Sequence, residues 1–181
     1  MKNRSEGGFS YIDVMIAIVI LTVGILALMA AIAGSVLLSK GQETQLSAKQ
    51  IATSTMESIR SAKETSDASR LGWPSIGNVG SNVDTLGIAR GIFQVGPQAV
   101  KSDAGPDEVV GTADDTGTTS NFRREIIITD ICDPDRPSYN CATPGTAPVR
   151  IRSIRVKIYY FVGNLQRQEV LNNVLTDIAP N

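Results

Sequence analysis

The chain has 181 residues, with 17 basic and 18 acidic side chains and a formal net charge of −1. This length allows one membrane helix and one globular domain, and the balanced charge gives no basis for general binding to nucleic acid or anionic lipid. Histidine is absent, so the chain lacks the commonest general base and the commonest metal ligand. We therefore expect a protein that is not an enzyme and that needs no cofactor or metal ion.

A long apolar run dominates the first part of the chain. Residues 14–39 contain no charged residue and no proline, and they exceed the roughly 20 residues that cross a bilayer core. Lys2 and Arg4 precede the run and favour a cytoplasmic N-terminus, with the rest of the chain outside. Three interpretations remain: an uncleaved signal anchor, a secretory signal peptide cleaved at the Ala-Ile-Ala triplet of residues 31–33, and a prepilin-type leader.

The segment at the start of this run, GFSYIDVM at residues 8–15, resembles the cleavage and methylation motif of type IV prepilins and pseudopilins. In that family a dedicated peptidase cuts after the glycine and methylates the new N-terminal amine. The resemblance implies a leader of residues 1–8, a cut between Gly8 and Phe9, and a subunit-assembly role for Asp13. The family usually has glutamate at that position and leucine in place of Tyr11. Residues 20–28, ILTVGILAL, also resemble V-type minor pilins and I-type minor pseudopilins.

Asp13 has a physical meaning that does not depend on the family. After cleavage at Gly8, the amine of Phe9 would lie about one helical turn away, and a neighbouring subunit would offer a second amine. At an effective dielectric near 20 such a pair is worth about 4 kcal/mol at roughly 4 Å, whereas an unpaired acid in lipid is unfavourable. Packing against a neighbour would relieve that penalty. The alternative is that Asp13 only caps the helix, where an acid is favourable in any case.

The helix is expected to continue beyond the membrane. We assign residues 9–39 to the membrane or filament-core half and residues 40–70 to an amphipathic half. One face of the second half is apolar at helical spacing, and Leu46 does not fit it. That face comprises Ala48, Ile51, Ala52, Thr55, Ile59 and Ala62, with Met56 at its edge.

The middle of the chain is mostly predicted as loop. Gly72-Trp73-Pro74 should end the helical part, and residues 91–95 are a short strand candidate. Residues 102–121 form an acidic loop whose acidic residues have no basic residue among them. Calcium is a conceivable ligand there, but the spacing does not fit an EF-hand, and a solvated surface loop is favoured.

The last part of the chain has the clearest β pattern. Residues 124–131 have the β-branched density of a buried strand, and apolar residues alternate from Ile154 to Val162. Gly163-Asn164 suits a two-residue turn, with residues 165–175 returning as the partner strand. The alternation slips before Ile154, which predicts a bulge near Ser153.

Cys132 and Cys141 bracket a short loop in this globular β domain, residues 71–181. Because they are a short loop apart in a domain expected outside the cytoplasm, we expect them to form a disulfide. A metal site with only these two ligands is not expected, since no histidine is present to complete it. The loop of residues 132–141 is then either a contact surface for a neighbouring subunit or simply a connection closed by the disulfide.

These features predict an α+β fold in which a long N-terminal helix packs its outer half on an antiparallel sheet of about four strands. The resemblance implies a type IV pilin-like ladle and a non-enzymatic minor pilin or pseudopilin. Its expected partners are other subunits, prepilin peptidase, an inner-membrane assembly platform and membrane lipid. It would reside in a bacterial inner membrane with its C-terminal domain outside the cytoplasm, or in a filament. The alternative is a signal-anchored binding module that never assembles.

Overall fold

The structure is a computed structural model that describes residues 10–65, 71–84, 86–132 and 149–177. It contains one long helix, α1 (Tyr11–Glu64), a short 3-10 turn, η1 (Trp73–Ser75), and four strands. The strands are β1 (Gln98–Asp103), β2 (Thr116–Ile131), β3 (Ile151–Val162) and β4 (Leu165–Thr176). The chain divides into two compact units, Met1–Glu43 and Thr44–Asn181, which we describe separately.

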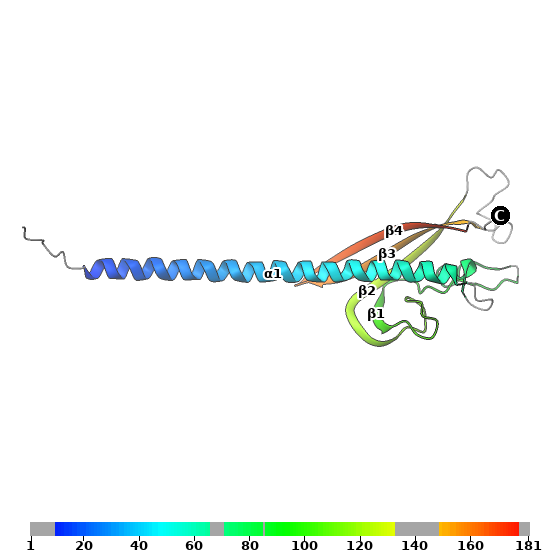
Figure 1. Cartoon of the computed structure of the whole chain (residues 1–181), viewed down its shortest axis with the longest axis horizontal. Helices are drawn as coiled ribbons and strands as arrows, with labels where there is room; N and C mark the ends of the chain where they lie inside the picture. The colour runs from blue at the N-terminus through cyan, green and yellow to red at the C-terminus, as the bar shows by residue number, and fades with distance from the viewer. Residues whose placement is uncertain (1–9, 66–70, 85, 133–148, 178–181) are drawn as a thin grey trace, which may run out of the picture. The chain divides into compact units, whose positions relative to one another are not determined.

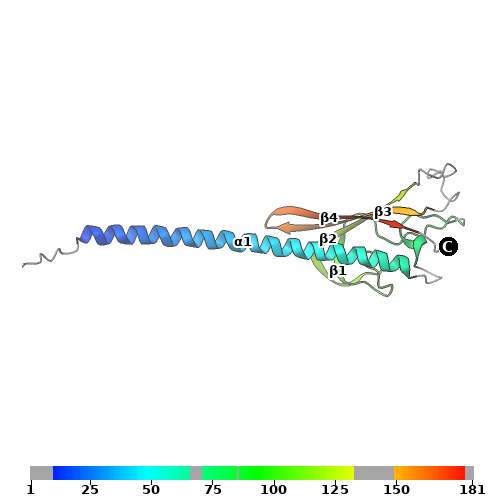
Figure 2. The same cartoon turned by 45° about the horizontal axis from the view of Figure 1, so that its top comes forward.

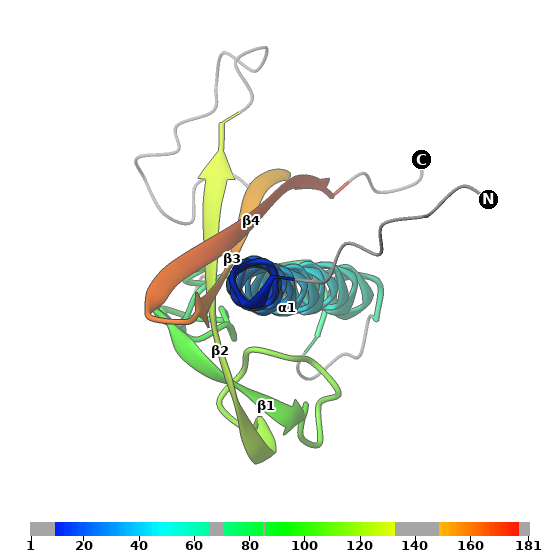
Figure 3. The same cartoon turned by 90° about the vertical axis from the view of Figure 1, so that its left-hand side faces the viewer.

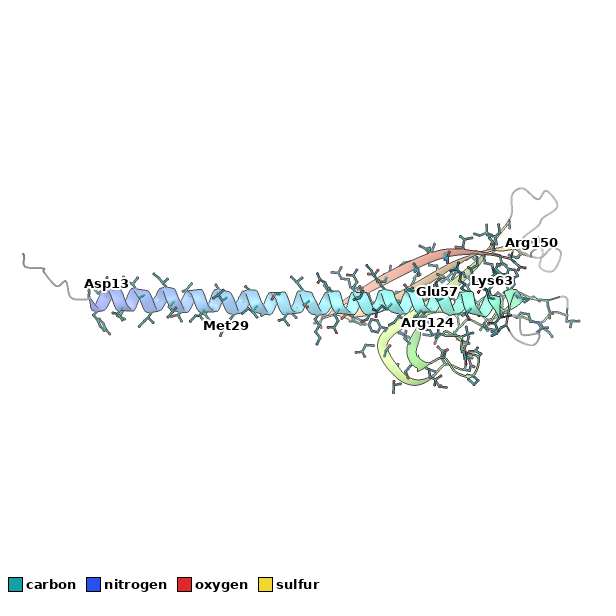
Figure 4. All side chains as sticks on the ribbon, in the orientation of Figure 1. Asp13, Met29, Glu57, Lys63, Arg124 and Arg150 are labelled. Carbon is teal, nitrogen blue, oxygen red and sulfur yellow. The ribbon has the colours of Figure 1, made fainter. Side chains whose placement is uncertain are left out.

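The first unit consists, in its described part, of the apolar portion of α1. Its hydropathy averages 2.9 over the most apolar window, and it is long and apolar enough to cross a membrane. Every large apolar side chain from Tyr11 to Leu38 is between 43% and 78% exposed. Figure 4 shows side chains projecting from both edges of this part of the helix, with Asp13 labelled near its start and Met29 further along. Exposure of so much apolar surface to water is unfavourable, so lipid or other helices must bury the surface of this unit.

The second unit is an α+β domain in which the C-terminal part of α1 packs on a four-stranded antiparallel sheet. The sheet order is β1-β2-β3-β4, a simple meander (Figure 1). Viewed along the helix, β2, β3 and β4 lie to one side of α1 (Figure 3). The amphipathic face predicted from the sequence is confirmed, because the helix residues buried in this core are those of the predicted face: Ala48, Ala52, Thr55, Met56, Ile59 and Ala62.

The β3–β4 hairpin also agrees with the prediction. Its pairing is unbroken from Ile151↔Thr176 to Val162↔Leu165, around the two-residue turn at Gly163 and Asn164. Gly163 has φ of 60°, which glycine adopts without strain. Ile154, Val156 and Ile158 are fully buried between the strands and the helix.

The bulge predicted near Ser153 is wrong. The registers of β3 with both β2 and β4 run without a shift through Ser153. The apolar alternation slips because the inward position before Ile154 is held by Arg152, which is only 4% exposed. Irregular pairing occurs instead between β1 and β2, on either side of Lys101.

Two further predictions in the middle of the chain need correction. Residues 91–95 do not form a strand of the sheet: Phe93 makes only an isolated parallel bridge to Asn78, and its buried side chain packs into the core. The first strand is β1, which begins after Pro97. The predicted acidic loop, residues 102–121, is partly strand, because β1 extends to Asp103 and β2 begins at Thr116. Only residues 104–115 connect the two strands.

Helix α1 ends at Glu64, so the predicted amphipathic segment of residues 40–70 is too long at its C-terminal side. Residues 66–70 lie outside the described residues. The amide of Gly72 then donates to the carbonyl of Ala62 at 2.9 Å, which brings the chain back against the last turn of the helix. Gly72 has φ of 116°, a backbone conformation that a residue with a Cβ rarely adopts.

Candidate functional site

The first candidate site is the beginning of α1, where Asp13 lies in the first helical turn. Its amide donates to the carbonyl of Ser10 at 3.0 Å. Within the described part of the chain, no hydrogen bond or ion pair reaches its carboxylate, and the residue is exposed. The helix dipole favours an acid there, but no cation of the described residues neutralises it. Gly8 and Phe9 lie outside the described residues, so cleavage between them stays a prediction.

Two hydroxyl groups of the apolar run, those of Thr22 and Ser35, donate hydrogen bonds to carbonyls of their own helix. Thr22 donates to the carbonyl of Ile18, and Ser35 donates to the carbonyl of Ile32 at 2.9 Å. Side-chain bonds to the preceding turn remove the cost of carrying a hydroxyl into lipid. Asp13 is the one charged residue of residues 10–39, and within the described part of the chain its carboxylate has no partner.

The second candidate site is the acidic connection between β1 and β2, where Asp115 is buried with Arg124 of β2. Their closest atoms, Asp115 Oδ2 and an Arg124 terminal nitrogen, lie 2.6 Å apart, and their side chains are 8% and 3% exposed. The Asp115 carboxylate also accepts the amides of Gly111 and Thr112. Burial lowers the pKa of Arg124, and the Asp115 charge opposes that effect. Arg124 Nε has no hydrogen-bond partner among the described residues.

This ion pair corrects the prediction of a solvated acidic loop. Asp115 is 7% exposed and is balanced by a cation from the following strand, which a local count of charges does not show. Asp103 and Glu108 are exposed, as predicted. The described residues contain no group of three or more His, Cys, Asp or Glu side chains that could hold a metal ion.

Two further acids of this connection, Asp107 and Asp114, accept hydrogen bonds from the loop's own backbone. Burial raises the pKa of Asp107, whereas the Thr112 hydroxyl lowers the pKa of Asp114. Asp107 accepts the amide of Val109 at 2.8 Å. The loop is fixed to the helix because the amide of Val110 donates to the Ser58 hydroxyl at 3.1 Å. The acidic residues thus fold the connection into a defined structure.

A surface cavity of about 250 Å³ opens beside this connection. Lys101 contributes an ammonium that donates to the backbone carbonyl of Asp115 at 2.6 Å. Five of the cavity's eight described lining residues have polar or charged side chains, and none of the eight is aromatic; the lining consists of Gln94, Gln98, Ala99, Lys101, Gly111, Thr112, Ala113 and Asp115. Such a lining suits a small polar molecule better than an apolar one.

Arg152 is a third buried charged residue, and it joins the sheet to the segment that follows the helix. Its Nε donates to Asp130 at 2.9 Å, and a terminal nitrogen donates to the carbonyls of Trp73 and Ile76, the latter at 2.7 Å. The guanidinium also lies 4.4 Å from the centre of the Trp73 ring. These contacts are those of a structural clamp. The slip in apolar alternation before Ile154 was the sequence signal for it.

The outer face of the sheet carries a charged group that the sequence did not reveal. Glu125 on β2 accepts from Lys157 at 3.1 Å and from the Tyr159 hydroxyl at 2.7 Å, both on β3. These contacts lower the pKa of Glu125, chiefly through Tyr159, and raise the pKa values of Lys157 and Tyr159. Only the pairing of β2 with β3 brings these three residues together, so no sequence motif could have predicted the group.

The predicted disulfide between Cys132 and Cys141 stays a prediction. Cys132 directly follows the end of β2 at Ile131 and is exposed. Cys141 lies outside the described residues.

Comparison of the chain with protein-family models, with curated proteins and with solved structures finds no match.

Proposed function

We propose that this chain is a minor pilin or pseudopilin, a non-enzymatic subunit of a type IV pilus or a related secretion pseudopilus. The observation that carries the proposal is the apolar run of α1, which is exposed along its length. In its first turn it carries Asp13, whose carboxylate has no partner among the described residues. A simple membrane anchor inserts more favourably when it has no acidic residue at the edge of the bilayer. A filament subunit uses such an acid, because a neighbour's N-terminal amine neutralises it.

The second unit supports the same proposal. Its α1 face is already covered by the sheet, so the core is complete without the apolar run. The fold therefore separates a globular domain, which can be displayed, from a helix that must be covered by lipid or by other helices. This separation suits a subunit that moves from a bilayer into a filament core.

The proposed partners follow from this route. Prepilin peptidase would cut between Gly8 and Phe9 and methylate Phe9, an inner-membrane platform would extract the subunit, and other pilin or pseudopilin subunits would pair with Asp13. The protein would lie in a bacterial inner membrane with Thr44–Asn181 outside the cytoplasm, or in a filament. It would support filament initiation, adhesion, motility, DNA uptake or secretion.

The mass and N-terminal sequence of the mature protein, purified from membranes, test the proposal. We expect a chain that begins with methylated Phe9. A chain that begins at Met1 would contradict the proposal and indicate a permanent anchor, and one that begins at Gly34 would indicate a secreted domain. A Gly8→Ala variant provides the control, because it should keep its leader while its globular domain folds normally.

A signal-anchored binding module is the second candidate function, and the polar cavity beside Asp115 favours it. Such a protein would stay in the membrane, keep its N-terminal segment, and hold a small polar molecule against Lys101. Replacement of Asp13 separates the two candidates, because an anchor should insert at least as well without the charge.

A further inference from the structure

The turn of the β3–β4 hairpin carries two large apolar side chains that are exposed. Phe161 is 59% exposed and Leu165 is 64% exposed, on either side of Gly163 and Asn164. Phe161 pairs with Gln166, and Val162 pairs with Leu165, so Phe161 and Leu165 project from opposite faces of the hairpin. The turn therefore exposes apolar side chains on both of its faces. We call residues 161–165 the hairpin tip.

Contacts within the second unit fix the direction in which the hairpin tip points. Near the start of the unit's helix, Gln45 donates to Glu169 of β4 at 2.7 Å. At the other end of the hairpin, Arg152 contacts the carbonyls of Trp73 and Ile76, in the segment that follows the helix. The tip therefore extends from Glu169 away from the helix C-terminus. Figure 2 shows the turn at the opposite end of the sheet from the end of β2.

Chain connectivity limits how far the hairpin tip can lie from a bilayer that holds the apolar run. Leu38, the last apolar residue of that run, precedes Gln45 by seven residues within α1. Seven helical residues span about 11 Å, whatever the direction of the anchor. The five residues from Glu169 to Asn164 extend about 17 Å along a strand. The tip can thus reach the membrane surface from its attachment at Gln45.

We propose that the hairpin tip inserts into the boundary between headgroups and acyl chains of the bilayer that holds the chain's own anchor. Phenylalanine and leucine suit this boundary, and the exposed Arg167 suits anionic headgroups beside it. The proposal rests on the membrane anchoring in the proposed function. Lipid is favoured over a second copy as occupant because the short connection from Leu38 to Gln45 keeps the tip within reach of lipid in every anchored monomer, whereas a second copy is met only on assembly.

Photo-crosslinking of the full chain in vesicles of phosphatidylethanolamine and phosphatidylglycerol tests this proposal. The aromatic photo-crosslinker p-benzoylphenylalanine replaces Phe161 in one variant. It replaces Val174, exposed on the same sheet face near the other end of β4, in the matched control. A third variant carries it at Ile20, within the apolar run. We expect lipid adducts at Ile20, and at Phe161 in at least about five-fold higher yield than at Val174.

Equal lipid yields at Phe161 and Val174, or crosslinks from Phe161 mainly to a second copy, would overturn the hairpin proposal. If Ile20 still crosslinks to lipid in that case, the anchor stands and only the hairpin proposal fails. Absence of lipid adducts at Ile20 would overturn both the hairpin proposal and the membrane anchoring on which it rests.

Discussion

At the scale of single residues, two arginines occupy positions on the apolar face of the sheet. Arg124 and Arg152 are each 4% exposed and alternate with core residues along β2 and β3. A buried guanidinium is tolerated only when carboxylates or carbonyls compensate it, and its planar fork suits several acceptors at once. Asp115 pairs with Arg124, whereas Asp130 and two backbone carbonyls accept hydrogen bonds from Arg152. The two arginines thus tie peripheral segments to the sheet.

Replacing Arg152 with Met should destabilise the second unit by about 2 to 3 kcal/mol, because the buried carbonyls of Trp73 and Ile76 lose their donor. Chemical unfolding of the detergent-solubilised chain, followed by the fluorescence of Trp73, measures the change. Arg155→Met is the matched control on the same strand: Arg155 is exposed, so its loss should change stability by less than about 0.5 kcal/mol. Equal effects of the two substitutions would contradict the clamp.

Glu125 should make the free energy of unfolding depend on pH in the acidic range. Its pKa is lowered in the folded state from 4.5, so its contribution is complete above 4.5 and is lost as the pH falls through the lower folded value. The stability difference between the parent and Glu125→Gln should therefore be constant near neutral pH and shrink below 4.5. Unfolding midpoints measured at a series of pH values provide the test. Glu57→Gln, at a more exposed pair on α1, is the control and should show a smaller change. A difference that grows on acidification would contradict the assigned contacts.

At the scale of elements, the sequence predicted what depends on periodicity. The amphipathic face of α1 and the β3–β4 hairpin repeat apolar residues at the spacing of their structure, because each buries one face. The sequence did not predict β1 or the start of β2. Residues 116–121, at the start of β2, are polar and exposed and therefore carry no such repeat. Only pairing with β1 makes them strand. The buried Asp115–Arg124 pair depends on the same long-range register.

The apolar run predicts a specific response to changes at Asp13. Asp13→Ala should still insert into membranes, since removal of a charge favours lipid, but its incorporation into filaments should fall at least about ten-fold. Asp13→Glu, which keeps the charge on a longer side chain, should retain incorporation. Quantification of the subunit in sheared filaments and in the membrane fraction measures both. Undiminished incorporation of Asp13→Ala would contradict the assembly role of the carboxylate.

At the scale of the whole molecule, the two units have different requirements. The second unit buries its own core, with Ile59, Phe93 and Ile158 fully enclosed. In the described part of the first unit no side chain is buried. Folding of the second unit therefore needs no lipid, whereas the first needs lipid or neighbouring helices. The sequence predicted this division because the apolar run is continuous, while later apolar residues alternate with polar ones.

The orientation of the molecule across the membrane leads to a prediction about Cys132 and Cys141. If the second unit lies outside the cytoplasm, the two cysteines should be oxidised to a disulfide. A membrane-impermeant maleimide should then fail to label the chain in intact spheroplasts until a reductant is added, because only free thiols react. Reduction should lower the free energy of unfolding by about 2 to 3 kcal/mol, since it releases a loop of this size. The double variant Cys132→Ser/Cys141→Ser should show the same lower stability with and without reductant. Labelling before reduction would show free thiols outside the cytoplasm, and labelling only after lysis would reverse the orientation.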